Sequence, residues 1–143
     1  MKQSFLLILA LIFIIICIVS LNLINIQNEH KEIAKQNMEY EYYLDKIIMG
    51  TDLASLISKV INQNEKNGVL KDKNGLYIDN NKNSIKIDLK MTTIDKTYPM
   101  EAIYNSQMIN FVQNFNIIQF KCTKIEYHQN SKLVSKLVFE EQL

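Results

Sequence analysis

FLLILALIFIIICIVSL, residues Phe5–Leu21, is the stretch that decides how the whole chain is organised. It carries no charge, and its most polar side chain is Ser20. The apolar run then continues with few interruptions to Ile26. At about 1.5 Å per residue, a helix from Phe5 to Ile26 spans roughly 33 Å, which exceeds the ~30 Å hydrocarbon core of a bilayer. We therefore predict a single-pass transmembrane helix over residues 1–26 that acts as an uncleaved signal anchor.

A cleaved signal peptide and a buried core helix are the alternatives to an anchor. A signal peptide has an apolar core of about 7–15 residues, followed by a small-x-small cleavage site. This run is longer, and Val19-Ser20-Leu21 does not offer that pattern. Lipidation of Cys17 is not expected, because isoleucines precede it where a small residue is required. A very short N-terminal tail before a folded domain is the layout of a signal anchor, so we expect a cell-membrane protein whose C-terminal domain is extracytoplasmic.

Charge divides the chain into two unlike parts. The 143 residues are 48% hydrophobic and 22% charged, with a formal net charge of +1. Lys2 is the only charged residue among the first 26, and the remainder balances 15 Lys against 15 Asp and Glu. The sequence has no Arg, whose planar guanidinium group binds a phosphate or a carboxylate through two parallel hydrogen bonds. A neutral domain without Arg argues against a nucleic-acid partner, and the length allows one small domain with an accessory segment.

Residues 27–44 are polar and contain neither Gly nor Pro, so we predict a helical stalk that continues the membrane helix. The extracytoplasmic domain is expected over residues 45–143. Its clearest element is a helix that begins with Thr51 as a candidate N-cap and Asp52 in the first turn. This helix should end near Asn67-Gly68, where Gly can adopt the left-handed conformation. Its apolar positions recur at helical spacing and are Leu53, Leu56, Ile57, Val60 and Ile61.

Two further segments show clear periodicity. Residues 84–91 alternate apolar and polar side chains, as expected of a strand with one solvated face. Residues 101–115 have the spacing of an amphipathic helix. Its stripe is expected to pack in the core, with a partner-binding groove as the alternative. The stripe consists of Tyr104, Met108, Phe111 and Phe115.

The remaining segments predict short strands and a long hairpin. Residues 118–127 and 133–139 are expected to pair, with a turn at 128–131 and a bulge near Thr123-Lys124 where the alternation changes phase. A strand or an extended entry is also expected at 45–50, and short strands at 69–71 and 76–78 around an Asp-Lys-Asn-Gly turn. The predicted fold class is α+β, in which a small antiparallel sheet is packed by two amphipathic helices behind the transmembrane helix and stalk.

Side chains that could support catalysis are few. His30 lies in the stalk, so Cys122 and His128 are the only thiol and imidazole in the domain. Six residues apart on a strand, at about 3.3 Å per residue, they would be ~20 Å apart, too far for a nucleophile and its base. Cys122 has no partner within the domain, so we expect a buried thiol, with pairing between chains as the alternative. We predict no catalytic residue and no enzymatic activity.

Asp79-x-Asn81-x-Asn83 is similar to the start of a calcium-binding loop. Ser84 stands at the sixth position, where the sharp turn needs Gly, and Lys90 at the twelfth, where a bidentate Glu is required. We therefore expect a polar turn. The sequence has no zinc-type Cys/His spacing and no glycine-rich phosphate loop. No metal and no cofactor are predicted.

The sequence IIMGTDLASLI, residues 47–57, resembles small, N-terminally anchored extracytoplasmic proteins of low-GC Gram-positive bacteria that are generally uncharacterised. The likeness includes the strands at 83–87 and 120–128, covers most of the domain and implies no activity. The layout is also similar to that of pilins and pseudopilins, in which an apolar N-terminal helix leads into an α+β head. Residues 4–8, SFLLI, lack the Gly and Glu of the pilin processing signature, so the resemblance does not extend to processing.

The sequence supports three functional hypotheses. The first is a membrane-anchored, non-catalytic interaction or structural module of the bacterial cell envelope, accessory to a pilus-like assembly and bound to a protein partner. The second is an extracytoplasmic ligand-sensing domain with an apolar cavity near Tyr104 and Phe111. The third is a soluble protein secreted after signal cleavage. The sequence assigns no residues to an interaction surface.

Overall fold

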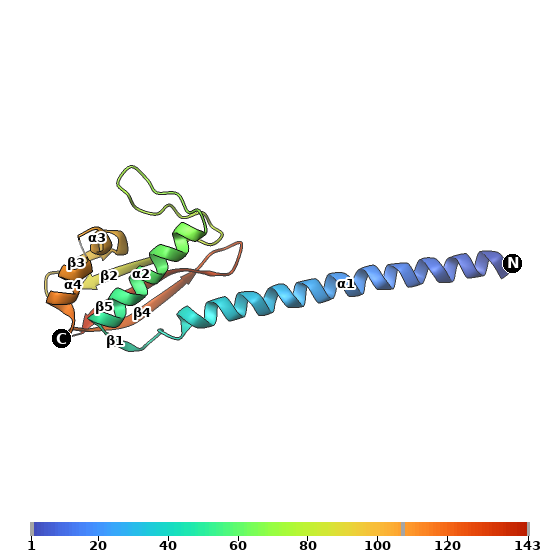
Figure 1. Ribbon diagram of the computed structural model, residues 1–143. Helices are drawn as coiled ribbons and strands as arrows, with labels where there is room; N and C mark the ends of the chain where they lie inside the picture. The colour runs from blue at the N-terminus through green and yellow to red at the C-terminus, as the bar shows by residue number, and fades with distance from the viewer. Residues whose placement is uncertain (1, 107, 143) are drawn as a thin grey trace. The chain divides into compact units, whose positions relative to one another are not determined.

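α1 (Lys2–Glu41) is a helix of 40 residues in the computed structural model, which describes residues 2–106 and 108–142 (Figure 1). All its large hydrophobic side chains from Leu6 to Ile26 are at least 50% exposed. The mean hydropathy reaches 3.2 over an 18-residue window of this helix. The predicted N-terminal helix is therefore confirmed, and it is long and apolar enough to cross a membrane.

The chain forms two compact units, and the second, which we call the head, begins at Gln36. The last residues of α1 belong to this unit, where Asn37 and Tyr40 are buried. Asn37 donates a hydrogen bond to the Lys132 carbonyl at 2.9 Å, and its Oδ1 atom accepts one from the Val134 N–H at 2.9 Å. The end of the helix is thus fixed to the turn between the last two strands.

A five-stranded sheet forms the framework of the head, in the order β1-β4-β5-β2-β3. Its strands are β1 (Ile47–Met49), β2 (Lys86–Met91), β3 (Lys96–Pro99), β4 (Gln119–Tyr127) and β5 (Val134–Gln142). The predicted α+β class and the β4–β5 hairpin are confirmed, including a register shift between Cys122 and Lys124. The β2–β5 pair is parallel, so the sheet is mixed and not purely antiparallel. Side-chain alternation reports which face of a strand is buried and not the direction of its neighbour, which is why this pairing was not predicted.

Helix α2 (Gly50–Lys66) lies across the sheet and buries the predicted apolar stripe (Figure 1). Each of those five side chains is no more than 2% exposed, which contributes roughly 1.5–3 kcal/mol apiece from burial. The prediction of Thr51 as N-cap is wrong. The helix begins two residues earlier than predicted, and its N-cap, Met49, makes no side-chain cap bond. The Gly50 N–H donates to the Ile118 carbonyl at 3.0 Å. The helix ends at Lys66, and Gly68 follows with φ of +64°.

The segment expected as one helix at 101–115 contains two, α3 (Met100–Asn105) and α4 (Met108–Phe115). This break divides the predicted stripe between two helices. Phe111 on α4 is 6% exposed, whereas Tyr104 on α3 is 41% exposed. The strands expected around residues 69–78 are reduced to a single bridge between Lys71 and Tyr77. The Asp72 carboxylate accepts hydrogen bonds from the N–H groups of residues 74 and 76, so this segment is a turn.

Candidate functional site

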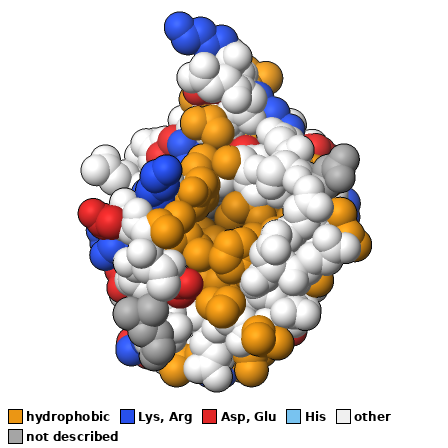
Figure 2. Space-filling view, turned by 90° about the vertical axis from the view of Figure 1, so that its left-hand side faces the viewer, with side chains coloured by type: hydrophobic (Ala, Val, Ile, Leu, Met, Phe, Trp, Pro, Cys, Tyr) orange, Lys and Arg blue, Asp and Glu red, His pale blue; other side chains and the backbone are white. Residues whose placement is uncertain are grey.

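A groove with a volume of about 310 Å³ opens where α3 and α4 meet β2 and β3. Figure 2 shows a hydrophobic hollow on the head, bordered on one flank by uncharged polar side chains and backbone. None of the described residues that line the groove carries a charge. They are Leu89, Met91, Ile94, Tyr98, Ala102, Ile103, Ser106, Asn110, Phe111, Asn114 and Phe115. We refer to this set as the groove.

The floor of the groove is part of the hydrophobic core. Leu89 and Met91 point from alternate positions of β2 and are 1% and 3% exposed. Phe111 of α4 belongs to the same core cluster, and its ring stacks on Phe115 with centroids 5.1 Å apart. Ile94, in the turn between β2 and β3, is 54% exposed at the mouth. The strand and helix periodicities thus supply a floor that is apolar and already ordered.

The polar residues of the groove lie on α4 and just before it. Asn110 and Asn114, which we call the row, are four residues apart on α4 and lie above one another on neighbouring turns, whereas Ser106 is the C-cap of α3. The Asn110 amide donates to the Ser106 carbonyl at 3.0 Å, and the Asn114 amide to the Asn110 carbonyl at 2.8 Å. These bonds orient both side chains. An Asn amide carries two N–H donors and a carbonyl acceptor, so the row presents neutral hydrogen-bonding groups beside the apolar floor.

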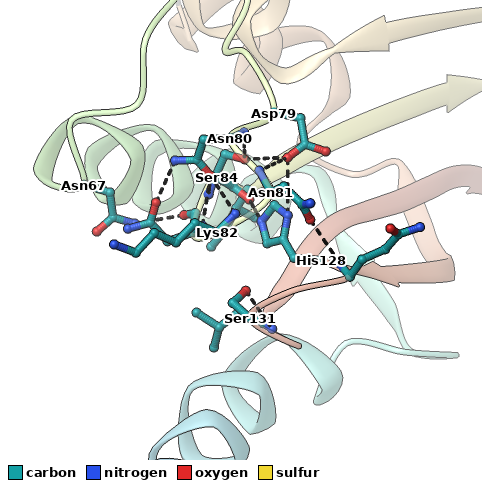
Figure 3. A network of polar contacts seen from close by, with 12 residues as sticks. Asn67, Asp79, Asn80, Asn81, Lys82, Ser84, His128 and Ser131 are labelled. Carbon is teal, nitrogen blue, oxygen red and sulfur yellow. Dashed lines mark hydrogen bonds and ion pairs between the residues drawn. The ribbon is translucent and has the colours of Figure 1, made fainter.

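A second cluster of polar contacts surrounds His128 (Figure 3). Its side chain is 1% exposed, and its Nε2 atom lies 2.7 Å from the Ser84 carbonyl, which can only accept a hydrogen bond. Nε2 therefore carries a proton. The Nδ1 atom lies 3.3 Å from Asp79 Oδ1 without making a hydrogen bond within the described structure. The cluster joins the β4–β5 turn to the loop of residues 79–84.

Asp79 organises this loop through its own hydrogen bonds. Its Oδ1 atom accepts from the Asn81 N–H at 2.7 Å and from the Ser84 hydroxyl at 3.2 Å. The bond from the Asn81 backbone lowers the pKa of the Asp79 carboxyl, burial opposes this, and the nearby His128 adds to the lowering. Its Oδ1 atom thus accepts two hydrogen bonds from within the turn. Among residues 2–106 and 108–142, no three metal-ligating His, Cys, Asp or Glu side chains converge.

The other two sequence candidates in the head, Cys122 and His128, make separate contacts. Cys122 on β4 is fully buried with its Sγ atom 3.8 Å from the Lys124 carbonyl, and burial raises the pKa of its thiol to about 11. The His128 ring contacts Ser84 and Asp79 instead of this thiol. His30 is exposed on α1. The described contacts therefore do not pair the Cys122 thiol with the His128 imidazole.

The sequence predicts only some of the residues that line the groove. The expected cavity near Phe111 exists, but Tyr104 does not line it, because the break between α3 and α4 turns this residue outward. The sheet side of the groove and the Asn110 position were not identified. The alternation of residues 84–91 does place Leu89 and Met91 on a core face, although no local pattern shows that a groove opens beside α4 at this part of the face. No known protein family, curated protein or solved structure matches this chain.

Proposed function

We propose that the protein is a membrane-anchored, non-catalytic interaction module whose head binds a protein partner. The observation that carries the proposal is the apolar surface of α1, where every large hydrophobic side chain from Leu6 to Ile26 is at least 50% exposed. An exposed apolar surface of this length is unfavourable in water and matches the thickness of a bilayer. The helix thus supplies a tether for the head.

The groove supports the binding part of the proposal. It is concave, mostly apolar and bordered by a few polar groups, which are the general features of a recognition site. The anchored layout and the resemblances of the sequence extend the proposal to the bacterial cell envelope, with the head extracytoplasmic and accessory to a pilus-like assembly.

Crosslinking in intact membranes tests this function. Cells expressing the full chain are treated with a short amine-reactive crosslinker, since the head carries many lysines. We expect discrete higher-mass species that contain this chain and a second polypeptide, reproducible across preparations. A matched sample solubilised in detergent before crosslinking shows whether the species depend on the membrane. A strictly monomeric pattern in the intact membrane would contradict the proposal.

A ligand-sensing head is the second candidate, and the groove around Phe111 is the observation that favours it. Its volume of about 310 Å³ is within the range of small-molecule sites, roughly 300–1,000 Å³. A sensor is expected to bind a small molecule and to change its partner contacts when the ligand is added. The interaction module requires no such molecule. Crosslinking with and without a small-molecule extract of the cells therefore separates the two functions.

A further inference from the structure

We propose that the groove binds an extended, uncharged peptide segment of the partner protein. Apolar side chains of that segment rest on the groove floor, and its backbone amides form hydrogen bonds with Asn110 and Asn114. This inference rests on the proposed interaction function, and it names the chemistry of the partner. Three properties of the groove favour such a segment over a lipid chain, a charged peptide or a partner helix.

The first property is the absence of charge. The described lining residues offer no ionised group that could pair with a charged side chain. A charge transferred from water onto an apolar floor without a partner is strongly unfavourable. The occupant must therefore be uncharged where it lies in the groove, so segments with Lys, Asp or Glu at the buried positions are rejected.

The second property is the chemistry of the polar row. A peptide unit presents one N–H donor and one carbonyl acceptor, and an Asn amide offers the complementary pair. A hydrocarbon chain has neither group. Asn110 and Asn114 already use one N–H each for the helix carbonyls, which holds the rest of each amide in a fixed orientation. This arrangement favours a backbone over an acyl chain.

The third property is spacing. Residues four apart on α4 are separated by about 6 Å along the helix axis. In an extended peptide, units that face the same side recur every two residues, at about 6.6 Å. Asn110 and Asn114 can therefore meet two alternate peptide units of an extended segment, which face the same side. A helical partner satisfies its backbone groups internally and gains nothing from the row.

The size of the groove sets the length of the segment. Its volume of about 310 Å³ is roughly twice that of a 150 Å³ cavity that accommodates benzene. Two apolar side chains of Leu or Phe size are thus expected to fill it, at alternate positions of the segment. Tyr98 lines the groove from β3, the end strand of the sheet.

Nuclear magnetic resonance of the full chain in nanodiscs provides the test. The probe is the blocked pentapeptide acetyl-Gly-Leu-Gly-Leu-Gly-amide, with three comparisons: its Lys analogue, its backbone N-methylated analogue and 1-hexanol. We expect the unmodified peptide to shift the side-chain amide signals of Asn110 and Asn114. The Lys and N-methylated analogues should leave these signals in place. Binding of 1-hexanol or of the N-methylated analogue at equal strength would overturn the proposal, as would the absence of binding by the peptide.

Three variants locate the peptide-binding site on the head. Ala102→Phe adds a large side chain at an exposed lining position and should abolish binding, whereas Ile117→Phe, at a residue 78% exposed outside the groove, should not. Replacing both Asn110 and Asn114 by Ala removes two neutral hydrogen bonds and should weaken binding about tenfold. Unchanged affinity in the Asn variant would contradict the role of the row.

The same variants distinguish this inference from the proposed function. Membrane crosslinking that persists unchanged in Ala102→Phe would leave the interaction module intact but exclude the groove as its binding site. Crosslinking that is absent from the unmodified chain would contradict the interaction module itself.

Discussion

Gly50→Ala should destabilise the head, although alanine is the better helix former. Gly50 is the first residue of α2, where the helix approaches the end of α4. A Cβ atom at this position would lie 1.9 Å from the Phe115 carbonyl oxygen and 2.7 Å from its carbonyl carbon. Both are backbone atoms, so no side-chain rotation relieves the contact. The two helix ends must move apart, and Phe115, which lines the groove, must move with them.

The expected change in the free energy of unfolding of Gly50→Ala is the balance of two effects. The helix preference for Ala over Gly contributes at most about 0.5–1 kcal/mol in favour of the variant. Forcing an extra methyl group into a packed region costs about 1–3 kcal/mol, and the upper end applies here because the obstacle is backbone. We expect a net loss of about 2 kcal/mol. For a domain of this size that lowers Tm by roughly 8–16 °C.

Thermal unfolding of the full chain in detergent, followed by near-ultraviolet circular dichroism of the tyrosines, measures this loss. Gly68→Ala is the matched control. Gly68 has φ of +64° and open space around it, so its substitution costs only the left-handed strain of about 1–2 kcal/mol. The groove resonances should shift in Gly50→Ala and not in Gly68→Ala. A Gly50→Ala variant as stable as the unmodified protein would refute the described approach of α2 to α4.

Three further predictions concern buried and titratable groups. The Asn64 side chain donates to the Ile85 carbonyl at 2.7 Å and accepts from the Ile85 N–H at 2.9 Å. Asn64→Ala leaves both buried groups without this partner and should lower the free energy of unfolding by roughly 2–4 kcal/mol in urea titration. A loss below about 1 kcal/mol would contradict these two hydrogen bonds. Cys122, in a Cys17→Ser background, should react with iodoacetamide only after unfolding, because it is buried and its thiol pKa is raised to about 11; rapid labelling of the folded chain would contradict its burial. The carboxyl pKa of Asp79 is lower in the folded chain than its unfolded value near 3.9. The ionised carboxylate therefore stabilises the fold at a pH above about 3.9, and this stabilisation is lost as the pH falls from there through the folded-state pKa. Unfolding between pH 5 and pH 3 should therefore show a steeper loss of stability in the unmodified chain than in Asp79→Asn, and equal slopes would count against the loop geometry.

Local periodicity predicted the elements that bury one continuous face. The α2 stripe and the alternation in β2 each place a whole set of side chains on one side, so position in the sequence is sufficient to find the core. The β4 bulge was also predictable, because the change of phase near Thr123 is visible in the sequence.

Features that depend on contacts distant in sequence were not predictable. Thr51 has the right chemistry for an N-cap, but the Ile118 carbonyl pairs with the Gly50 N–H and α2 begins earlier. The parallel β2–β5 pairing depends on a crossover of the chain and not on either strand. The groove was predictable only in part. The alternation in β2 places Leu89 and Met91 on the core face, but the opening of the groove depends on where α4 packs.

Intact-mass measurement of the protein extracted from cell membranes shows whether residues 1–26 remain on the chain as an anchor. We expect a chain of 16.7 kDa that retains residues 1–26, stays with the membrane in alkaline carbonate and has a head that external protease can reach. A shorter soluble chain that lacks residues 1–26 would contradict the anchor.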